Sequence, residues 1–263
     1  AYIFNVQFCL YLYCDDKSKT PMKTLVIIPS RLSATRLPRK PLLKINGLSM
    51  ISHVFKKAQD ANIGEVFVAA EDQEIVDDVR KNGGEAILTS NSHLTGTDRI
   101  FEAVKKLDKK DIQFVMNLQG DEPMINKEDI QNLNEQMIKT GYDLGTLASK
   151  INQKKIFENE NIVKVITDES LDRSQFPHAI KFLRKSDMKI KNTYHHLGIY
   201  CYNLETLRKF VSLKRSPNEI KNRLEQLRAL DNNMKIDVLL ANHYSIGIDT
   251  KKDLDECRKL LNK

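Results

Sequence analysis

The sequence of 263 residues has no tryptophan, only four cysteines, and no apolar run near the ~20 residues that span a bilayer. The cysteines have no C-x-x-C spacing; they are Cys9, Cys14, Cys201 and Cys257. A disulfide framework or a zinc site is therefore disfavoured, and reduced thiols in a cytoplasmic protein are expected. The length fits one large α/β domain, which buries enough apolar surface to fold without disulfides or structural metal.

The charge balance also lacks a feature that nucleic-acid-binding proteins often have. There are 42 Lys and Arg against 35 Asp and Glu, a net charge of +7 that favours anionic partners. No run of five or more basic residues occurs, and aromatic residues are not interleaved with basic ones. Nucleic acid and membrane surfaces are thus weaker predictions than small phosphorylated substrates, and scattered solvated lysines remain the plainer alternative.

The first 21 residues differ from the rest. The apolar stretch AYIFNVQFCLYLYC is followed by the polar DDKSKTP. It has neither the basic start nor the small-residue cleavage site of a secretory signal. We predict that residues 1–21 are an extension outside the fold and that residues 22–263 form the working domain. A short segment that touches a membrane is the alternative.

Apolar β-branched runs alternate with segments that have helical spacing of apolar residues. Strands are predicted over residues 24–29, 66–70, 86–88, 114–119, 144–149, 162–167, 179–183, 197–202 and 236–241. Helices are predicted over residues 50–61, 74–82, 97–106, 204–211, 219–230 and 251–261. Gly83 is expected to close the second helix, and Thr97 and Asp98 to cap the third.

This alternation predicts an α/β fold with a Rossmann-like, mainly parallel, doubly wound sheet. The second half has more strands and fewer helices, which indicates a small lobe that covers the site. Ligands of such sheets bind beyond the carboxyl ends of the strands. The predicted site therefore consists of the loops after Pro29, after Ala70, around residues 89–99 and after Gln119.

The loop IPSRLSATRLPRKPL, residues 28–42, is rich in cations at a strand end. It offers seven groups to an anion: Arg31, Arg36, Arg39, Lys40, Ser30, Ser33 and Thr35. Small residues let backbone N–H groups approach phosphates, and Arg and Lys neutralise them. The Walker pattern GxxxxGK[ST] is absent. We interpret this loop as a phosphate-binding segment, with a solvated basic loop as the less favoured alternative.

The segment NLQGDEPMI, residues 117–125, places acidic residues after a buried strand. Asp121 suits Mg²⁺, which prefers hard oxygen ligands and often takes one or two carboxylates. A plain turn before the next helix explains the same residues equally well. Asp249, in GIDT, precedes the last helix, where a capping or turn role is the simple reading.

Residues 88–99, LTSNSHLTGTDR, lead into the third predicted helix. Free N–H groups at a helix start bind anions or the polar edge of a base. His93 is a candidate to contact a base, although a loop histidine without function is commoner.

Together these segments resemble a known family. The set IPSRxxxTRLPxKPL, TxxxHxxGTDR, NxQGDEPMI, HxGIYxY, LEQLR and GIDTxxDL is similar to the bacterial 3-deoxy-manno-octulosonate (Kdo) cytidylyltransferases, in the same order over residues 22–263. The resemblance implies transfer of CMP from CTP to Kdo, a nucleotide-diphospho-sugar transferase type of fold with a small sugar-binding and dimerisation lobe, Mg²⁺, a homodimer, and a place in lipopolysaccharide biosynthesis.

The resemblance also implies roles for single residues. The nucleotide set is Ser30, Arg31, Arg36, Lys40, His93, Thr97, Asp98 and Gln119, with Arg36 and Lys40 also catalytic. Asp121 and Asp249 match the catalytic metal ligands. The sugar set is Gln119, Arg184, His196, Tyr200, Glu225 and Gln226.

Two stretches depart from the family pattern. The Ser/Thr-x-Ile-Pro turn after the family's arginine is missing from AIKFLRKS, residues 179–186, and LRALDNN, residues 227–233, replaces an LRVLWYG-like stretch. The first change leaves open another acidic sugar, such as N-acylneuraminate or an amino-Kdo. A basic nucleic-acid-binding protein is the rival from a different class.

Overall fold

The computed structural model describes residues 23–33, 37–186, 190–243 and 247–261. Several predictions fall on the remaining residues: the extension over residues 1–21 with its thiols Cys9 and Cys14, the start of the domain at Met22, its end at Lys263, and the roles of Thr35 and Arg36. They lie outside the described residues.

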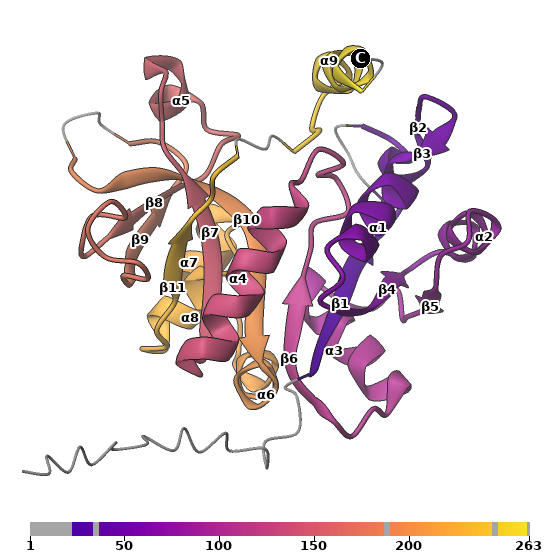
Figure 1. Cartoon of the computed structure of the whole chain (residues 1–263), viewed down its shortest axis with the longest axis horizontal. Coiled ribbons are helices and arrows are strands. Elements are labelled where there is room, and N and C mark those ends of the chain that lie inside the picture. The colour runs from indigo at the N-terminus through magenta and orange to yellow at the C-terminus, as the bar shows by residue number, and fades with distance from the viewer. Residues whose placement is uncertain (1–22, 34–36, 187–189, 244–246, 262–263) are drawn as a thin grey trace, which may run out of the picture.

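The main sheet has the strand order β11-β7-β10-β6-β1-β4-β5 (Figure 1). β10 pairs antiparallel with β6 and β7, and the other pairings along this path are parallel. Six of these seven strands therefore run the same way. The bounds are β1 Lys23–Ser30, β4 Gly64–Ala70, β5 Ala86–Leu88, β6 Ile112–Asn117, β7 Leu144–Ser149, β10 Thr193–Asn203 and β11 Asp237–Leu240.

A smaller lobe extends the sheet from β10. Strand β8 (Lys164–Thr167) pairs with β10, and β9 (Ala179–Leu183) pairs with β8, both antiparallel. A separate hairpin of β2 (Lys44–Ile45) and β3 (Leu48–Ser49) follows the short 3₁₀ helix η1 (Lys40–Leu42).

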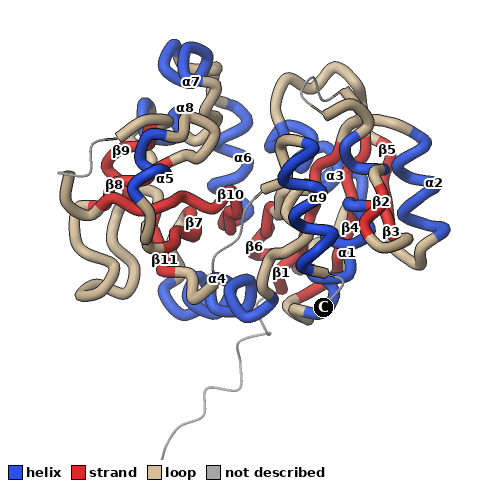
Figure 2. The backbone as a smooth tube through the Cα atoms, turned by 90° about the horizontal axis from the view of Figure 1, so that it is seen from above, coloured by secondary structure: helices blue, strands red, loops and turns tan. Residues whose placement is uncertain are grey.

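Helices cover both faces of the sheet. The side chains of β1 alternate, so Val26 and Ile28 join one core cluster while Leu25 and Ile27 join the other. Helices α1 (Met50–Asp60), α2 (Gln73–Lys81) and α4 (Lys127–Thr140) pack on the first face. Helices α3 (Gly96–Leu107), α6 (Leu204–Ser212) and α8 (Leu227–Asp231) pack on the second. Figure 2 shows α4 and α6 on opposite sides of β7, β10 and β6. The predicted fold class is thus confirmed.

Helix α9 (Lys251–Leu260) packs against the β2–β3 hairpin. Its Leu254 and Cys257 join Ile45, Met50 and Ile248 in a third apolar cluster. This contact brings the segment before α9 back to the first strand's exit. Among the described residues, no helix is long and apolar enough to cross a membrane.

The single helix predicted over residues 219–230 is wrong. Two short helices stand there, α7 (Pro217–Asn222) and α8, separated by residues 223–226, of which Arg223 has the left-handed conformation with φ 53°. The Arg184 guanidinium donates to the carbonyls of Asn222 and Arg223, at 2.9 Å each, and so fixes this break. A left-handed residue between helices is commonly glycine, but here it is Arg223. The contact from Arg184, in a distant segment, stabilises this conformation.

Other boundaries also shifted. The N-cap of α3 is Thr95, whose hydroxyl accepts from the Asp98 N–H, so the predicted cap at Thr97 and Asp98 is wrong by about one half-turn. Gly83 follows α2 with φ 81°, as predicted. Helices α4 and α5 (Lys154–Glu158) were not predicted.

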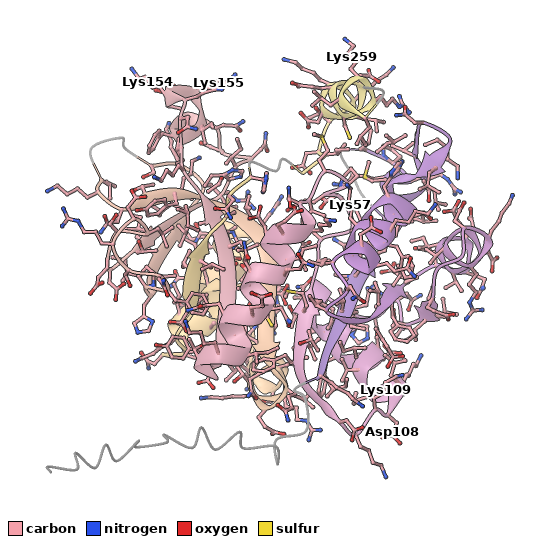
Figure 3. The ribbon with its side chains drawn as sticks, viewed as in Figure 1. Lys57, Asp108, Lys109, Lys154, Lys155 and Lys259 are labelled. Atoms are coloured by element: carbon pink, nitrogen blue, oxygen red, sulfur yellow. The ribbon has the colours of Figure 1, made fainter. Side chains whose placement is uncertain are left out.

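The lysines are spread over the molecule. Those labelled in Figure 3 come from α1, α5, α9 and the loop after α3, and they are Lys57, Lys154, Lys155, Lys259 and Lys109. Lys109 is paired with Glu65. This distribution matches the plainer reading of the net positive charge, that of solvated lysines.

Candidate active site

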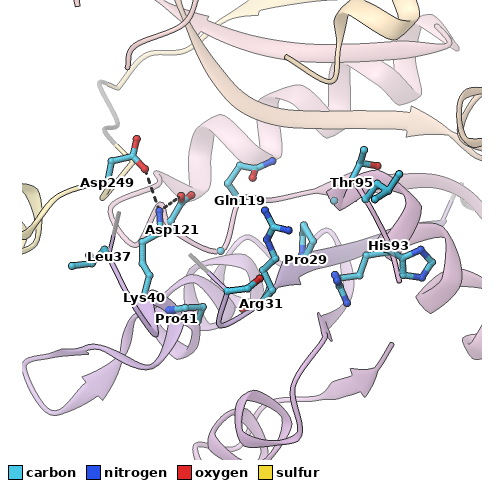
Figure 4. A pocket seen from close by; sticks show the side chains of 16 residues that line it. Pro29, Arg31, Leu37, Lys40, Pro41, His93, Thr95, Gln119, Asp121 and Asp249 are labelled. Atoms are coloured by element: carbon cyan, nitrogen blue, oxygen red, sulfur yellow. Dashed lines mark hydrogen bonds and ion pairs between the residues drawn. The ribbon is translucent and has the colours of Figure 1, made fainter. Parts of the chain in front are cut away.

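A cavity of about 420 Å³ lies at the carboxyl edge of the parallel strands. Its walls come from the exits of β1 and β6, the loop before α3, and the residue before α9 (Figure 4). This is the edge that the parallel topology predicts for a ligand. The lining residues are Pro29, Ser30, Arg31, Ser33, Leu37, Lys40, Pro41, His93, Leu94, Thr95, Gly96, Arg99, Gln119, Gly120, Asp121 and Asp249.

Lys40 joins the two candidate metal ligands. Its Nζ lies 2.7 Å from Asp121 Oδ2 and 3.3 Å from Asp249 Oδ1 (Figure 4). The three residues are separated by up to 209 positions in the sequence. Their side chains therefore meet through the fold rather than through any local motif, as the resemblance implied for the two carboxylates.

Backbone contacts hold these three segments together. Lys40 Nζ also donates to the Ile248 carbonyl, at 2.9 Å, and the Ile248 N–H donates to the Asp121 carbonyl, at 2.9 Å. Thr250 caps α9 in a capping box with Asp253. Asp249 is thus the turn residue beside the cap, and its carboxylate is directed into the cavity (Figure 4).

The ammonium of Lys40 remains charged at this site. Burial opposes the charge, but attraction to Asp121 and Asp249, with the hydrogen bonds to both, outweighs it. The pKa of Lys40 is consequently raised above its ordinary value. A permanent positive charge therefore stands between the two carboxylates.

The same two carboxylates fit a magnesium ion. They already converge on one cationic atom, and Mg²⁺ is commonly held by one or two carboxylates together with phosphate and water oxygens. Within the described ranges no group of three or more His, Cys, Asp or Glu side chains is placed to hold a metal. An ion at Asp121 and Asp249 would therefore need ligands from a substrate.

The cationic wall of the cavity includes one residue that the sequence did not nominate. Arg31 is exposed in this wall, and its contact with a phosphate stays a prediction, whereas Arg99 is buried. The Arg99 guanidinium pairs with Glu71 and donates to Thr89 Oγ1 at 2.7 Å. Its position in the GTDR segment, at the start of a helix beside the predicted ligand edge, was the available signal.

Arg39, which was predicted to face an anion, pairs with Glu74 on α2 and does not line the cavity.

His93 lines the cavity with its ring held from behind. Its Nε2 bonds to Glu102 on α3. Burial works against the Glu102 charge, but hydrogen bonds from Lys106, His93 and the Ser90 N–H lower the pKa of Glu102 to about 2. The carboxylate is thus ionised at neutral pH and orients the imidazole.

Two predicted nucleotide residues lie behind the cavity wall. Thr97 is buried and its hydroxyl bonds to Glu225 and Tyr202. Asp98 lies 3.7 Å from the Arg228 guanidinium and accepts from the Thr95 hydroxyl. Neither lines the cavity, so their contact with a nucleotide remains a prediction.

Most of the predicted sugar set gathers on one face of β10. His196 and Tyr200 have ring centroids 5.4 Å apart, and His196 bonds to Thr146. Burial is the main cause that lowers the pKa of His196 to about 3, so its ring is neutral. Gln119 lines the cavity and donates to the Gly198 carbonyl at 3.0 Å. Glu225 follows the break after α7 and acts on Tyr200 from the helical layer, and Gln226, which is buried next to it, keeps its sugar contact as a prediction.

Arg184 lies at the rim of that group rather than in the cavity. Besides the carbonyls of Asn222 and Arg223, its guanidinium donates to the Glu160 carbonyl at 3.2 Å. It therefore fixes the loop that carries Glu225. Its predicted contact with a sugar carboxylate stays a prediction.

The chain is similar to known proteins in sequence and in fold. The family profile described as cytidylyltransferase matches residues 25–236. A 3-deoxy-manno-octulosonate cytidylyltransferase from Rhodopseudomonas palustris (strain BisB18) is 43% identical over 244 residues, covering 92% of this chain and 99% of that protein. One from Thermodesulfovibrio yellowstonii is 43% identical over 252 residues, covering 92% and 99%.

The chain belongs to the 3-deoxy-manno-octulosonate cytidylyltransferase family. A solved structure of CMP:2-keto-3-deoxy-manno-octonic acid synthetase complexed with CTP matches it with a TM-score of 0.81 at 34% identity, covering 91% of this chain and 98% of that one. A 4-diphosphocytidyl-2C-methyl-D-erythritol synthase from Anaerococcus prevotii, at 16% identity and a TM-score of 0.63 over 92% and 97%, shares the fold. Membership of the family agrees with the resemblance of the motifs.

Proposed function

We propose that this cytidylyltransferase joins CMP from CTP to 3-deoxy-manno-octulosonate and releases pyrophosphate. The observation that carries the proposal is the meeting of Lys40, Asp121 and Asp249 in a cavity with a cationic wall, at the ligand edge of the sheet. The family relatives named for this reaction cover nearly all of the chain.

The reaction is a nucleotidyl transfer. An oxygen of the sugar's anomeric hydroxyl attacks the α-phosphorus of CTP, the bond to the β-phosphate oxygen breaks, and the hydroxyl proton passes to solvent. Such transfers depend mainly on positioning and on stabilisation of charge. Arg31, Lys40 and Arg99 supply positive charge where the triphosphate would lie.

Asp121 and Asp249 would hold the magnesium ion. When bound, the ion would neutralise phosphate charge and lower the pKa of the attacking hydroxyl. Lys40 would then exchange part of its contact with the carboxylates for a phosphate oxygen. Until that exchange, the lysine offsets the repulsion between the two carboxylates.

The sugar would occupy the space beside the group formed by His196, Tyr200 and Glu225. Gln119 stands between this group and the cavity, since it lines the cavity and is bonded to β10. The neutral imidazole of His196 suits contact with sugar hydroxyls. The proposal further includes a homodimer, a cytoplasmic location and supply of CMP-Kdo to lipopolysaccharide biosynthesis.

A substrate panel tests the proposal. Purified protein is supplied with CTP or UTP, Mg²⁺, and Kdo, an amino-Kdo or N-acylneuraminate, and pyrophosphate release is measured. We expect kcat/KM for CTP with Kdo to exceed the other pairs by about a hundredfold, because a site of matched hydrogen bonds rejects analogues strongly. A higher value for N-acylneuraminate would assign the enzyme to another acidic sugar.

A further inference from the structure

Four side-chain atoms in the described part of the chain are buried without a hydrogen-bond partner: Ser30 Oγ, Asn117 Oδ1, Tyr200 Oη and Glu225 Oε1. Such atoms destabilise a folded protein, because they lose their bonds to water and gain none in return. Ser30, Tyr200 and Glu225 already belong to the predicted substrate-binding sets. The remaining atom belongs to Asn117, to which no role has been given.

Asn117 lies at the end of β6, next to the cavity. It is 3% exposed and precedes the LQGD segment that supplies Gln119 and Asp121. In the sheet it is paired with Tyr200 on β10 and with Ile27 on β1. Paired residues of neighbouring strands direct their side chains to the same face. Asn117 therefore shares a face with Tyr200, whose hydroxyl also makes no hydrogen bond.

Two further members of the predicted sugar set, Glu225 and His196, lie beside Tyr200. Glu225 approaches it from the helical layer, held by hydrogen bonds to Thr97 and Thr95. Thr95 also lines the nucleotide cavity, so one residue separates Glu225 from the cavity. The His196 ring adjoins that of Tyr200. Asn117 thus stands among groups from three separate elements that all face one region.

We propose that Asn117 binds the sugar, with its side-chain carbonyl oxygen accepting a hydrogen bond from a hydroxyl group of the acidic sugar. The inference rests on the proposed function. The two oxygens that make no hydrogen bond, Asn117 Oδ1 and Glu225 Oε1, are acceptors, and the nearest cation to the second is Arg228 at 3.9 Å, so they call for a ligand rich in O–H donors. Phosphate oxygens are acceptors as well and cannot meet that need, whereas a polyhydroxylated sugar can.

The amide suits this place better than a carboxylate does. Glu225 already brings one carboxyl group to this face, and the sugar brings its own negative charge. A neutral acceptor binds a hydroxyl without adding to that repulsion. An asparagine is close in shape to aspartate, and this allows charge to be tested separately from shape.

The experiment compares Asn117→Leu, Asn117→Asp and wild type by thermal unfolding and by steady-state kinetics of pyrophosphate release. We expect Asn117→Leu to unfold at a temperature no lower than wild type, since it removes an unsatisfied acceptor. Its KM for the sugar should rise about tenfold or more, while the KM for CTP stays within about threefold. Asn117→Asp should also raise the KM for the sugar and leave the KM for CTP nearly unchanged, because its negative charge repels the acidic sugar.

Asn134→Leu is the matched control. Asn134 is also a buried amide, but its Oδ1 accepts from Thr24 Oγ1 at 2.6 Å and it lies on α4, on the opposite face. This variant should unfold at a lower temperature and keep the wild-type KM for the sugar.

Several outcomes overturn the inference. Asn117 variants with a wild-type KM for the sugar would exclude the contact, and an equal rise in KM for CTP would assign the residue to the nucleotide. If neither variant folds, Asn117 is a structural residue. Wild-type protein that does not turn over Kdo at all would refute the proposed function instead.

Discussion

Lys40 illustrates how one side chain can organise a site before substrate binds. Its ammonium has three oxygen partners, two from carboxylates and one from the Ile248 carbonyl. Three donors on a compact charge match these three oxygens, whereas the planar fork of arginine does not. The lysine thereby determines the separation of Asp121 and Asp249.

His195 gives a prediction at the scale of a single residue. Burial, and to a lesser degree Lys164, lower the pKa of its ring from 6.5 to about 4. The unfolded chain therefore takes up a proton below its higher pKa while the folded chain does not. The stability that the neutral His195 ring contributes is fully present above pH 6.5 and declines as the pH falls toward about 4.

His195→Gln removes this titration. We expect the melting temperature of wild type to fall more steeply than that of the variant between about pH 7 and pH 5, measured by circular dichroism. The two proteins share every other titrating group, so a difference between their slopes reports on His195 alone. Parallel slopes would mean that His195 does not titrate abnormally in the folded protein.

Between elements, the ion pair of Glu219 and Arg228 joins α7 to α8. Two hydrogen bonds of 2.8 and 2.9 Å connect the side chains, and both residues are 1% exposed. The guanidinium also lies 4.7 Å from the Phe210 ring centroid. The two short helices are thus locked to each other and to α6.

Arg228→Met should lower the free energy of unfolding by about 3–5 kcal/mol, because the buried Glu219 carboxylate then keeps only the partly exposed Arg215 as an ionic partner. Adding Glu219→Gln should recover part of that loss, since the buried carboxylate charge at Glu219 is then gone. Urea denaturation of the two single variants and the double variant measures the coupling. Strictly additive losses would show that the pair does not act as a unit.

The elements also differ in how far sequence could predict them. The buried strands around Val26, Val68 and Val115 follow from continuous β-branched runs, which only a doubly covered sheet accommodates. The break at Arg223 could not be predicted, because the residue that fixes it, Arg184, is 39 positions away. Helix α4 was missed even though Ile130, Leu133 and Met137 recur at helical spacing.

The site shows the same division. The residues of the loop after β1 indicated a phosphate-binding segment by themselves, whereas those of the QGDEP segment suited a magnesium ion and a plain turn equally well. Asp249 could be joined to Asp121 only through the family resemblance, and the bridging role of Lys40 through neither. Arg99 and Asn117 were not predicted because their burial, and the partners they have or lack, are properties of the folded chain.

On the scale of the whole molecule, the segment before the last helix lies beside the segment that follows the first strand. The segment after β1 supplies cations, the loop after β6 supplies one carboxylate, and the residues before α9, which packs on the β2–β3 hairpin, supply the other. The cavity is therefore complete only when residues from both ends of the domain are in place. Activity and the docking of α9 are expected to be lost together.

The central claim is that Asp121 and Asp249 act together at one nucleotide site. The most direct test is to measure magnesium-dependent release of pyrophosphate from CTP and Kdo by the variants Asp121→Asn and Asp249→Asn. Each variant should fold as wild type does and lose about a hundredfold or more in kcat, since each removes a carboxylate that would hold the magnesium ion at the reacting phosphates. Asp111→Asn is the control, because Asp111 is exposed and pairs with Lys23 at the opposite end of the strands. Wild-type rates from folded Asp121→Asn and Asp249→Asn would contradict the account.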